Sequence, residues 1–244
     1  MTAHSAFLKV EGVSKRYGSL QVTDNLSFSV EEGEAVGIIG PNGAGKTTLF
    51  NLIGGGVRPG AGRIVFRGED VTSLAPPERC RRGIGRSYQI PHPFTKMSVY
   101  ENVLVGATFG AKLSANEAEK VSLDVIERTG LMAKVNLKSG ALTLLDRKRL
   151  ELARALATRP RLLLLDEIAG GLTEREVRAL IETINAVRRE GVSIIWIEHL
   201  MHALLAVVDR IIAINFGALI ADGRPAEVMA DSKVRQIYMG VGAA

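Results

Sequence analysis

The sequence carries a phosphate-binding pattern early in the chain. Residues 40–47 read Gly-Pro-Asn-Gly-Ala-Gly-Lys-Thr and satisfy G-x-x-x-x-G-K-[ST]. Glycine at three of these positions lets the backbone curl around a phosphate chain, so that N–H groups and the positive end of the following helix point at the anion. We expect Lys46 to reach the outer phosphates and the Thr47 hydroxyl to bind Mg²⁺. The residues predicted to contact the nucleotide here are Gly40, Pro41, Asn42, Gly43, Ala44, Gly45, Lys46, Thr47 and Thr48.

An acidic pair follows an apolar run much further along the chain. Residues 162–165 are all leucine, and Asp166 and Glu167 come directly after them. Such a run predicts a buried parallel strand, and active groups lie at the carboxyl ends of strands in sheets of this kind. Asp166 is therefore placed to hold Mg²⁺, and Glu167 to polarise an attacking water. The alternative is an acidic cap on the next helix, whose first turn favours negative charge.

A histidine, His199, stands close behind another apolar run, Ile194–Ile197. A single histidine at a strand end is more often structural than catalytic. Because this strand is expected beside the two strands of the phosphate site, we predict that His199 donates to the terminal phosphate.

The elements that position these residues are predicted from periodicity. We expect short half-buried strands first, then a buried strand before the glycine loop and a helix after it. The expected strands are 7–10, 13–17, 26–30, 35–39, 63–67, 162–165, 193–197 and 211–214, and the expected helices are 47–53, 99–108, 116–128, 147–157 and 174–189. This order predicts an α/β fold. A P-loop NTPase core with an N-terminal antiparallel β portion is expected at about 1–88 and 158–244. An α-helical subdomain is expected as an insertion at about 89–157.

Composition narrows the class of protein. With 244 residues, 46% of them hydrophobic, the chain can bury one sizeable core. The net charge of +5 is spread along the chain and lacks the concentrated patch of a nucleic-acid binder, so no nucleic acid is expected as a partner. A single cysteine, Cys80, excludes an internal disulfide and fits a reducing cytoplasm. We find no secretory signal, and no apolar run approaches the length of about 20 residues that a membrane-spanning helix needs. Any role at a membrane is therefore expected to depend on a partner protein.

The loop at 40–47, LLLLDE at 162–167 and WIEH ending at His199 resemble the ATP-binding subunits of ABC transporters. The resemblance spans nearly the whole chain and implies one nucleotide-binding domain over 1–244, with two subunits enclosing two Mg-ATP and hydrolysing ATP. It also implies that Tyr17 in KRYG stacks on adenine, and that Gln89 in RSYQ lies at the metal site and links it to the membrane partner. Taken alone, Tyr17 is better interpreted as a core aromatic and Gln89 as a surface polar residue.

Three longer segments are similar to the importers of branched-chain amino acids and related amides or urea. They are SVYENVLVG, RLELARALATRPRLLLLDE and GRPAEVMADSKVRQIYMG. The likeness implies separate permease subunits, a separate solute-binding protein and a second ATP-binding subunit that is either identical or paralogous. It also implies that the chain lies on the cytoplasmic face of the cell membrane. Ile90–Met97 is a candidate permease contact or an ordinary surface loop. A lipopolysaccharide-export ATPase has a related sequence, and a regulatory subunit that binds ATP with weak hydrolysis is the rival function.

The sequence departs from the family at its signature. Where the family has Ser-Gly-Gly before a helix, in a segment that closes over ATP held by the other subunit, residues 142–146 read Leu-Thr-Leu-Leu-Asp. Thr143 keeps a hydroxyl that would contact nucleotide, whereas two leucines add bulk and Asp146 adds negative charge or caps the helix. Ile168 replaces the usual proline, and Thr173 the usual Asp or Asn. We predict a slow or asymmetric composite site, with Lys46, Asp166, Glu167 and His199 still able to act.

Overall fold

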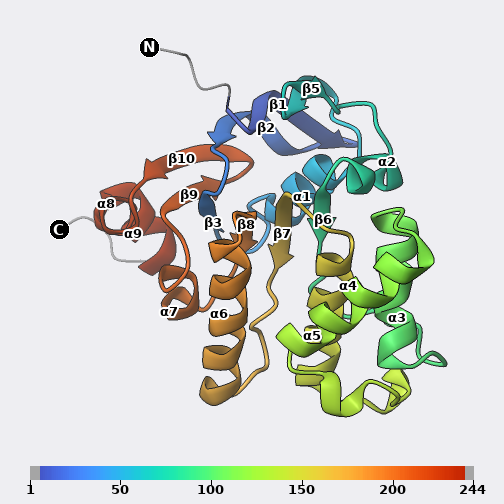
Figure 1. Ribbon diagram of the computed structural model, residues 1–244. Helices are drawn as coiled ribbons and strands as arrows, with labels where there is room; N and C mark the ends of the chain where they lie inside the picture. Colours follow the sequence, from blue (N-terminus) through green and yellow to red (C-terminus); the bar gives the residue numbers. More distant parts are fainter. Residues whose placement is uncertain (1–5, 240–244) are drawn as a thin grey trace. The chain divides into compact units, whose positions relative to one another are not determined.

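The computed structural model describes residues 6–239, and its contacts divide the chain into two units. The first unit combines the chain up to Pro76 with the chain from Ser193 onward, and the second runs from Pro77 to Val192. Figure 1 shows the helices and strands of both. Met1–Ser5 and the end of GRPAEVMADSKVRQIYMG, at Gly240, lie outside the described residues.

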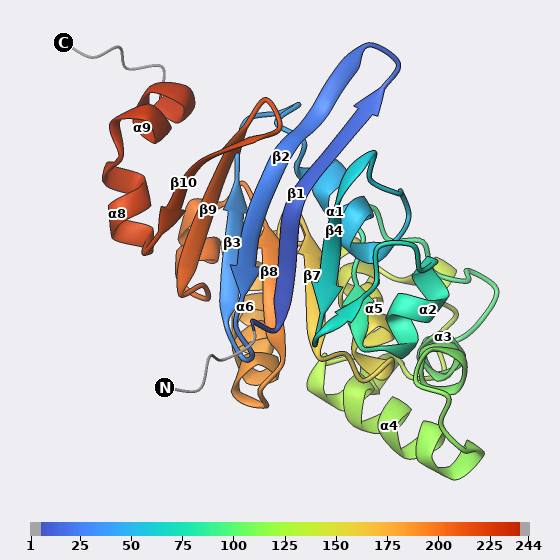
Figure 2. The ribbon, with the colours of Figure 1, turned by 90° about the horizontal axis from the view of Figure 1, so that it is seen from above.

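The first unit contains an antiparallel sheet with the strand order β2-β1-β4-β5. Its strands are β1 (Leu8–Tyr17), β2 (Leu20–Val30), β4 (Ala61–Phe66) and β5 (Glu69–Asp70). Figure 2 shows β1 and β2 as a long hairpin in blue. Along β1, buried residues such as Leu8 and Val10 alternate with more exposed ones, as expected for a strand with one face on the core.

The same unit contains parallel strands that carry the glycine loop. β3 (Ala35–Ile39) pairs in parallel with β8 (Ser193–Ile197) on one side and with β9 (Arg210–Asn215) on the other, and β10 (Ala218–Gly223) pairs antiparallel with β9. All residues of β3 and β8 are buried, which explains their uninterrupted apolar sequences. The helices of this unit are α1 (Lys46–Gly54), α7 (Met201–Leu205), α8 (Pro225–Ala230) and α9 (Ser232–Met239).

The second unit is mostly helical, and its two strands, β6 (Ile84–Arg86) and β7 (Leu162–Asp166), are parallel. Its α-helices are α3 (Val99–Val105), α4 (Ala115–Arg128), α5 (Leu144–Ala157), α6 (Glu174–Arg189) and all of α2 (Pro76–Arg81) except its first residue. A π-helical turn, η1 (Gly106–Gly110), follows α3, and two 3₁₀ turns, η2 (Met132–Lys134) and η3 (Ser139–Ala141), precede α5. Helices α3, α4 and α5 pack on one another.

The predicted α/β fold is confirmed, with differences in detail. The strands expected at 7–10 and 13–17 form one strand, β1, which is irregular between Val10 and Val13 because Gly12 has a positive φ of 60°. The helix expected at 99–108 is α-helical only to Val105 and continues as the π-helical turn. The helical subdomain expected at 89–157 lies within the second unit, and its boundaries stay a prediction. No helix among residues 6–239 is long and apolar enough to cross a membrane.

Candidate nucleotide-binding and catalytic site

The glycine loop connects β3 to α1 and is closed tightly by neighbouring backbone. A Cβ on Gly40 would lie 2.4 Å from the Ile214 carbonyl oxygen, and one on Gly45 would lie 2.4 Å from the Val22 carbonyl oxygen. Gly45 also has a φ of 99°, which residues other than glycine adopt only with strain. Both positions therefore require glycine, and the loop keeps the concave backbone that a phosphate chain needs.

The first turn of α1 is open to an anion. Gly45 stands at its N-cap and makes no side-chain cap hydrogen bond, and a helix N-terminus attracts anions through its backbone N–H groups. The Lys46 side chain is 6% exposed, and its Nζ donates to the carbonyl oxygens of Gly40 at 2.6 Å and Pro41 at 3.0 Å. The ammonium group thus lies inside the curl of the loop, where it adds positive charge to the helix end, while Thr47 is exposed on the same turn. This arrangement fits a bound polyphosphate.

Tyr17 is at the end of β1, and its ring is 46% exposed, with Lys15 Nζ 5.4 Å from the ring centroid. The interpretation of Tyr17 as a core aromatic is therefore wrong. An exposed aromatic ring is free to stack on a base.

His199 follows β8 and is exposed, in the short connection to α7. A residue that the sequence analysis did not select, Glu198, holds this connection: it is 3% exposed, and its Oε1 accepts hydrogen bonds from the backbone N–H groups of His199 at 3.0 Å and Leu200 at 3.3 Å. The acidic residue in WIEH is the signal that could have identified it, because a buried carboxylate needs such donors.

In the second unit, Asp166 and Glu167 lie at the carboxyl end of β7, as predicted. The Asp166 side chain is buried, and its Oδ2 accepts from Arg86 Nη2 at 3.0 Å. Arg86 is the last residue of β6, and its own side chain is also mostly buried. The sequence analysis did not select Arg86, although an arginine directly before Ser-Tyr-Gln at the end of a buried strand was a visible signal.

Glu167 is held in an unusual backbone conformation. Its φ is 46°, in the left-handed region that costs a residue with a side chain about 1–2 kcal/mol. The Gln89 amide Nε2 donates a short hydrogen bond to Glu167 Oε2. Two predicted site residues, 78 positions apart in the sequence, therefore meet directly, and strain of this kind is concentrated at functional sites.

The altered signature forms the beginning of α5. Thr143 is its N-cap: the hydroxyl accepts from the Asp146 backbone N–H at 3.3 Å and donates to Asp146 Oδ2 at 2.7 Å. Asp146 is 4% exposed and also forms an ion pair with Lys134. Burial alone would raise the pKa of the Asp146 carboxyl, but the hydrogen bonds from Lys134 and Thr143 hold that pKa below its usual value. The capping residue is therefore Thr143 and not Asp146, and the charge of Asp146 is compensated by Lys134.

The two other departures from the family also have a structural setting. Ile168 is 3% exposed, so it contributes to the core. Thr173 caps α6, with its backbone N–H donating to Glu176 Oε2 at 2.8 Å, and threonine suits an N-cap as Asp and Asn do.

Lys148, missed in the sequence analysis, is buried on α5 and its Nζ donates to the carbonyl oxygens of Ile168 and Gly170. It ties the loop after Glu167 to the signature helix.

Two family models match this sequence. One is described as ABC transporter and matches residues 23–170, which include the glycine loop and Glu167. The other is described as branched-chain amino acid ATP-binding cassette transporter and matches residues 218–244.

Known proteins are similar over almost the whole chain. The high-affinity branched-chain amino acid transport ATP-binding protein BraF of Pseudomonas aeruginosa is 35% identical, with 96% of this chain and 97% of the relative covered. The lipopolysaccharide export system ATP-binding protein LptB of Haemophilus influenzae is 34% identical, with 96% and 98% covered. A crystal structure of the ADP conformation of an ATP-binding cassette has a TM-score of 0.86 at 30% identity, with 97% of this chain and all of that chain (100%) covered. The chain belongs to the ABC transporter family, and within it to the ATPases that couple ATP hydrolysis to transport.

Proposed function

We propose that this chain is the ATP-hydrolysing subunit of a transporter that imports branched-chain amino acids or related small amides. The observation that carries the solute class is the match of residues 218–244 to the branched-chain amino acid cassette. Similarity to BraF over 96% of the chain supports the same assignment. The closed glycine loop with its buried Lys46 supports the nucleotide-binding part of the proposal.

In the proposed site, the loop at 40–48 and Lys46 hold the phosphates, and Tyr17 stacks on adenine. Thr47, Asp166 and Gln89 would hold Mg²⁺, and their oxygen donors are the ligand type that this ion takes. The Gln89 amide nitrogen already donates to Glu167, which leaves the amide oxygen for a metal. Mg²⁺ would neutralise charge on the phosphates.

Glu167 accepts the proton of the attacking water, and the strained φ of 46° fixes where its carboxylate points. Gln89 orients that carboxylate, since it donates to one of its two oxygens. His199 donates to the terminal phosphate as charge develops there, and Glu198 holds the connection that carries His199. Thr143 contacts nucleotide only when its hydroxyl turns away from Asp146.

The proposed assembly has a second ATP-binding subunit, separate permease subunits and a solute-binding protein, and it lies at the cytoplasmic face of the cell membrane. The segment Ile90–Met97 is the proposed permease contact. Ile90 is 65% exposed and Phe94 is 45% exposed, so the segment offers apolar surface to a partner. Arg154 on α5 holds it by donating to the His92 carbonyl oxygen at 2.9 Å and lying 4.9 Å from the Phe94 ring centroid.

Two other functions have a specific observation in their favour. The 34% identity to LptB favours lipopolysaccharide export. The charged cap formed by Thr143, Asp146 and Lys134 favours a regulatory subunit that binds ATP with weak hydrolysis, because it places an ionised carboxylate in the segment that the family uses to approach phosphate.

The proposed ATPase activity is tested by measuring ATP hydrolysis and ATP binding on three purified variants. We expect Lys46→Ala to weaken ATP binding and to abolish turnover, and Glu167→Gln to abolish turnover while ATP binding is kept. Lys120→Ala, on the exposed face of α4, is the matched control and should leave both unchanged. Tight ATP binding without turnover in the unaltered chain, even with its permease, would favour the regulatory function.

The solute is tested by reconstituting the chain with its permease and solute-binding protein in vesicles. ATP-dependent uptake of leucine that is lost in Glu167→Gln supports import. Lipopolysaccharide extraction without leucine uptake would contradict it.

A further inference from the structure

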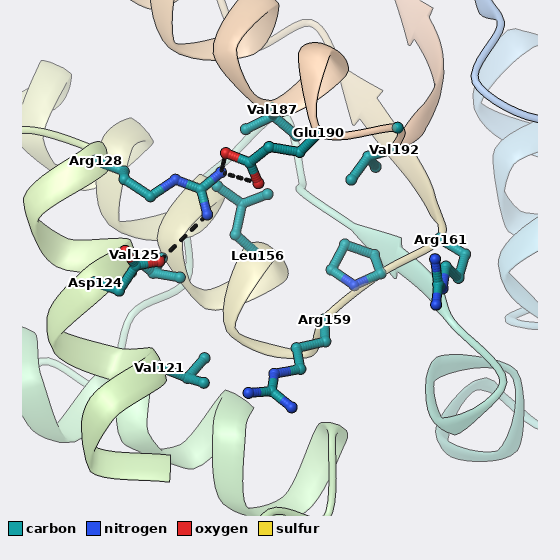
Figure 3. A pocket seen from close by; sticks show the side chains of 12 residues that line it. Val121, Asp124, Val125, Arg128, Leu156, Arg159, Arg161, Val187, Glu190 and Val192 are labelled. Atoms are coloured by element: carbon teal, nitrogen blue, oxygen red, sulfur yellow. Dashed lines mark hydrogen bonds and ion pairs between the residues drawn. The ribbon is translucent and has the colours of Figure 1, made fainter. Parts of the chain in front are cut away.

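A hollow of about 410 Å³ lies in the second unit, and none of its lining residues is among those assigned to the nucleotide. Figure 3 shows it from close by. Its lining comes from α4, from the end of α5 with the connection to β7, and from the end of α6 with the residues that follow. The volume is in the range of sites that take small organic molecules, about 300–1,000 Å³.

The floor of this hollow, which we call the α4–α6 pocket, is aliphatic. Val125, Leu156 and Val187 line it, and they are 2%, 5% and 1% exposed. Val121 and Val192 are half-buried at its sides. Branched aliphatic side chains from three elements thus converge on one surface, which favours a ligand with a compact apolar body over a purely ionic one.

Three charged side chains of the pocket are paired with one another. Arg128 forms ion pairs with Glu190 at 2.7 Å and with Asp124 at 3.3 Å, drawn as dashed lines in Figure 3. These two carboxylates and one guanidinium leave a formal charge of −1, so only the other charges of the lining can attract an anion.

The remaining charges are two guanidinium groups, those of Arg159 and Arg161. Both residues are exposed, and neither side chain has a hydrogen bond or ion pair with another residue in the part of the chain that the structure describes. Arg159 exerts only a weak charge effect on Glu117, whose low pKa is due mainly to hydrogen bonds with Ser114. Each guanidinium group offers five N–H donors, and Figure 3 shows Arg159 extending toward Val121 while Arg161 lies apart from it.

The backbone at Arg159 is strained. Its φ is 51°, a conformation that glycine or asparagine adopts at lower cost, by about 1 kcal/mol. The next residue, Pro160, is buried and lines the pocket, so the turn places one arginine on each side of it. Functional sites often retain a residue with a strained backbone, and here an arginine stands where glycine or asparagine would be less strained.

We propose that the α4–α6 pocket binds a small aliphatic carboxylate. Its carboxylate accepts hydrogen bonds from Arg159, which extends toward Val121 in Figure 3, and Arg161 adds positive charge to the lining. Its branched apolar body of about four to six carbons covers the valine and leucine floor. A free phosphate lacks the apolar body that would cover this floor, and a neutral aliphatic alcohol lacks the negative charge that makes hydrogen bonds to arginine strong. The inference does not depend on which solute the transporter carries.

Calorimetric titration of the full chain tests the proposal with four probes. 4-Methylpentanoate carries both features, leucine adds an ammonium group, 4-methylpentan-1-ol lacks the carboxylate, and inorganic phosphate lacks the apolar body. We expect saturable binding of 4-methylpentanoate and at least tenfold weaker binding of the alcohol and of phosphate. Binding of leucine as well would identify an amino acid as the natural ligand, whereas its failure to bind would identify a carboxylate without the ammonium group.

Variants locate the site. The double variant Arg159→Gln with Arg161→Gln should weaken 4-methylpentanoate binding at least tenfold, and Val121→Asp should do the same by placing a negative charge beside the ligand. Arg189→Gln, an exposed arginine of α6 outside the pocket, is the matched control and should bind as the unaltered chain does. Absence of saturable binding, equal binding of phosphate, or unchanged binding in both pocket variants would overturn the proposal. ATP turnover measured on the same samples would separate this outcome from failure of the nucleotide site.

Discussion

Thr143 donates a 2.7 Å hydrogen bond from its hydroxyl to the carboxylate of Asp146, which also pairs with Lys134. A hydroxyl has one proton to donate, so Thr143 cannot donate to a phosphate while it donates to Asp146. The first turn of α5 is therefore satisfied internally, with side chains in place of the small residues that the family carries there. The consequences concern both stability and catalysis.

The Asp146 carboxylate should stabilise the fold in a pH-dependent way. Its pKa is lowered in the folded state, so its contribution is fully present above the unfolded pKa of about 3.9 and is lost as pH falls through the folded pKa. We expect Asp146→Asn to lower the free energy of unfolding at pH 7 by about 1–3 kcal/mol, since it replaces a charged hydrogen-bond acceptor by a neutral one.

Urea unfolding at pH 7 and pH 3 measures this effect. The difference between Asp146→Asn and the unaltered chain should shrink at the lower pH. Glu119→Gln, on the exposed face of α4, is the control. An equal loss of stability at both pH values would show that the ion pair with Lys134 is not responsible.

Restoring the family signature should raise hydrolysis. In the triple variant Thr143→Ser, Leu144→Gly and Leu145→Gly, the two glycines remove the bulk of one exposed and one half-buried leucine and allow closer approach of backbone to phosphate. We expect at least a fivefold higher turnover in the purified protein, with α5 destabilised by about 1 kcal/mol per glycine. Steady-state hydrolysis and urea unfolding check the two parts. If turnover is equal in the two proteins, the idea of an impaired signature is wrong.

Much of the site could be predicted from the sequence because its residues occur in short local patterns. The glycine loop and the Asp166–Glu167 pair each depend on a strand and the residues directly after it, which a single segment reveals. Arg86 and Lys148 were missed because each acts through partners that packing brings close, whereas Glu198 accepts from the next two backbone N–H groups and was missed despite the local pattern WIEH. Arg86 meets Asp166 from another strand, and Lys148 reaches carbonyl groups 20 and 22 positions away. In the same way, the strand register and the π-helical turn after α3 depend on tertiary contacts that no local pattern contains.

The glycines of the phosphate loop should differ sharply in their tolerance of alanine. Gly45→Ala would place a Cβ 2.4 Å from the Val22 carbonyl oxygen at a φ of 99°. Because the obstacle is backbone, we expect a loss of about 3 kcal/mol or more in the free energy of unfolding, together with loss of ATP binding. Gly43→Ala is the matched comparison: its φ is 82° but nothing lies within 4 Å of the added Cβ, so about 1–2 kcal/mol is expected. Equal stability of the two variants would contradict the described loop packing.

Lys148 should control the loop that follows Glu167. Its buried ammonium group donates to the carbonyl oxygens of Ile168 and Gly170, so it fixes the backbone just beyond the strained Glu167. In Lys148→Met the apolar stem is kept and the donor to both carbonyl groups is lost, at a cost of about 1–3 kcal/mol for the carbonyl group of buried Ile168. We expect a lower kcat with little change in ATP affinity, because the glycine loop is untouched. Lys148→Arg keeps the charge and should restore part of the turnover. A lower affinity with unchanged kcat would assign Lys148 to nucleotide binding and not to the position of Glu167.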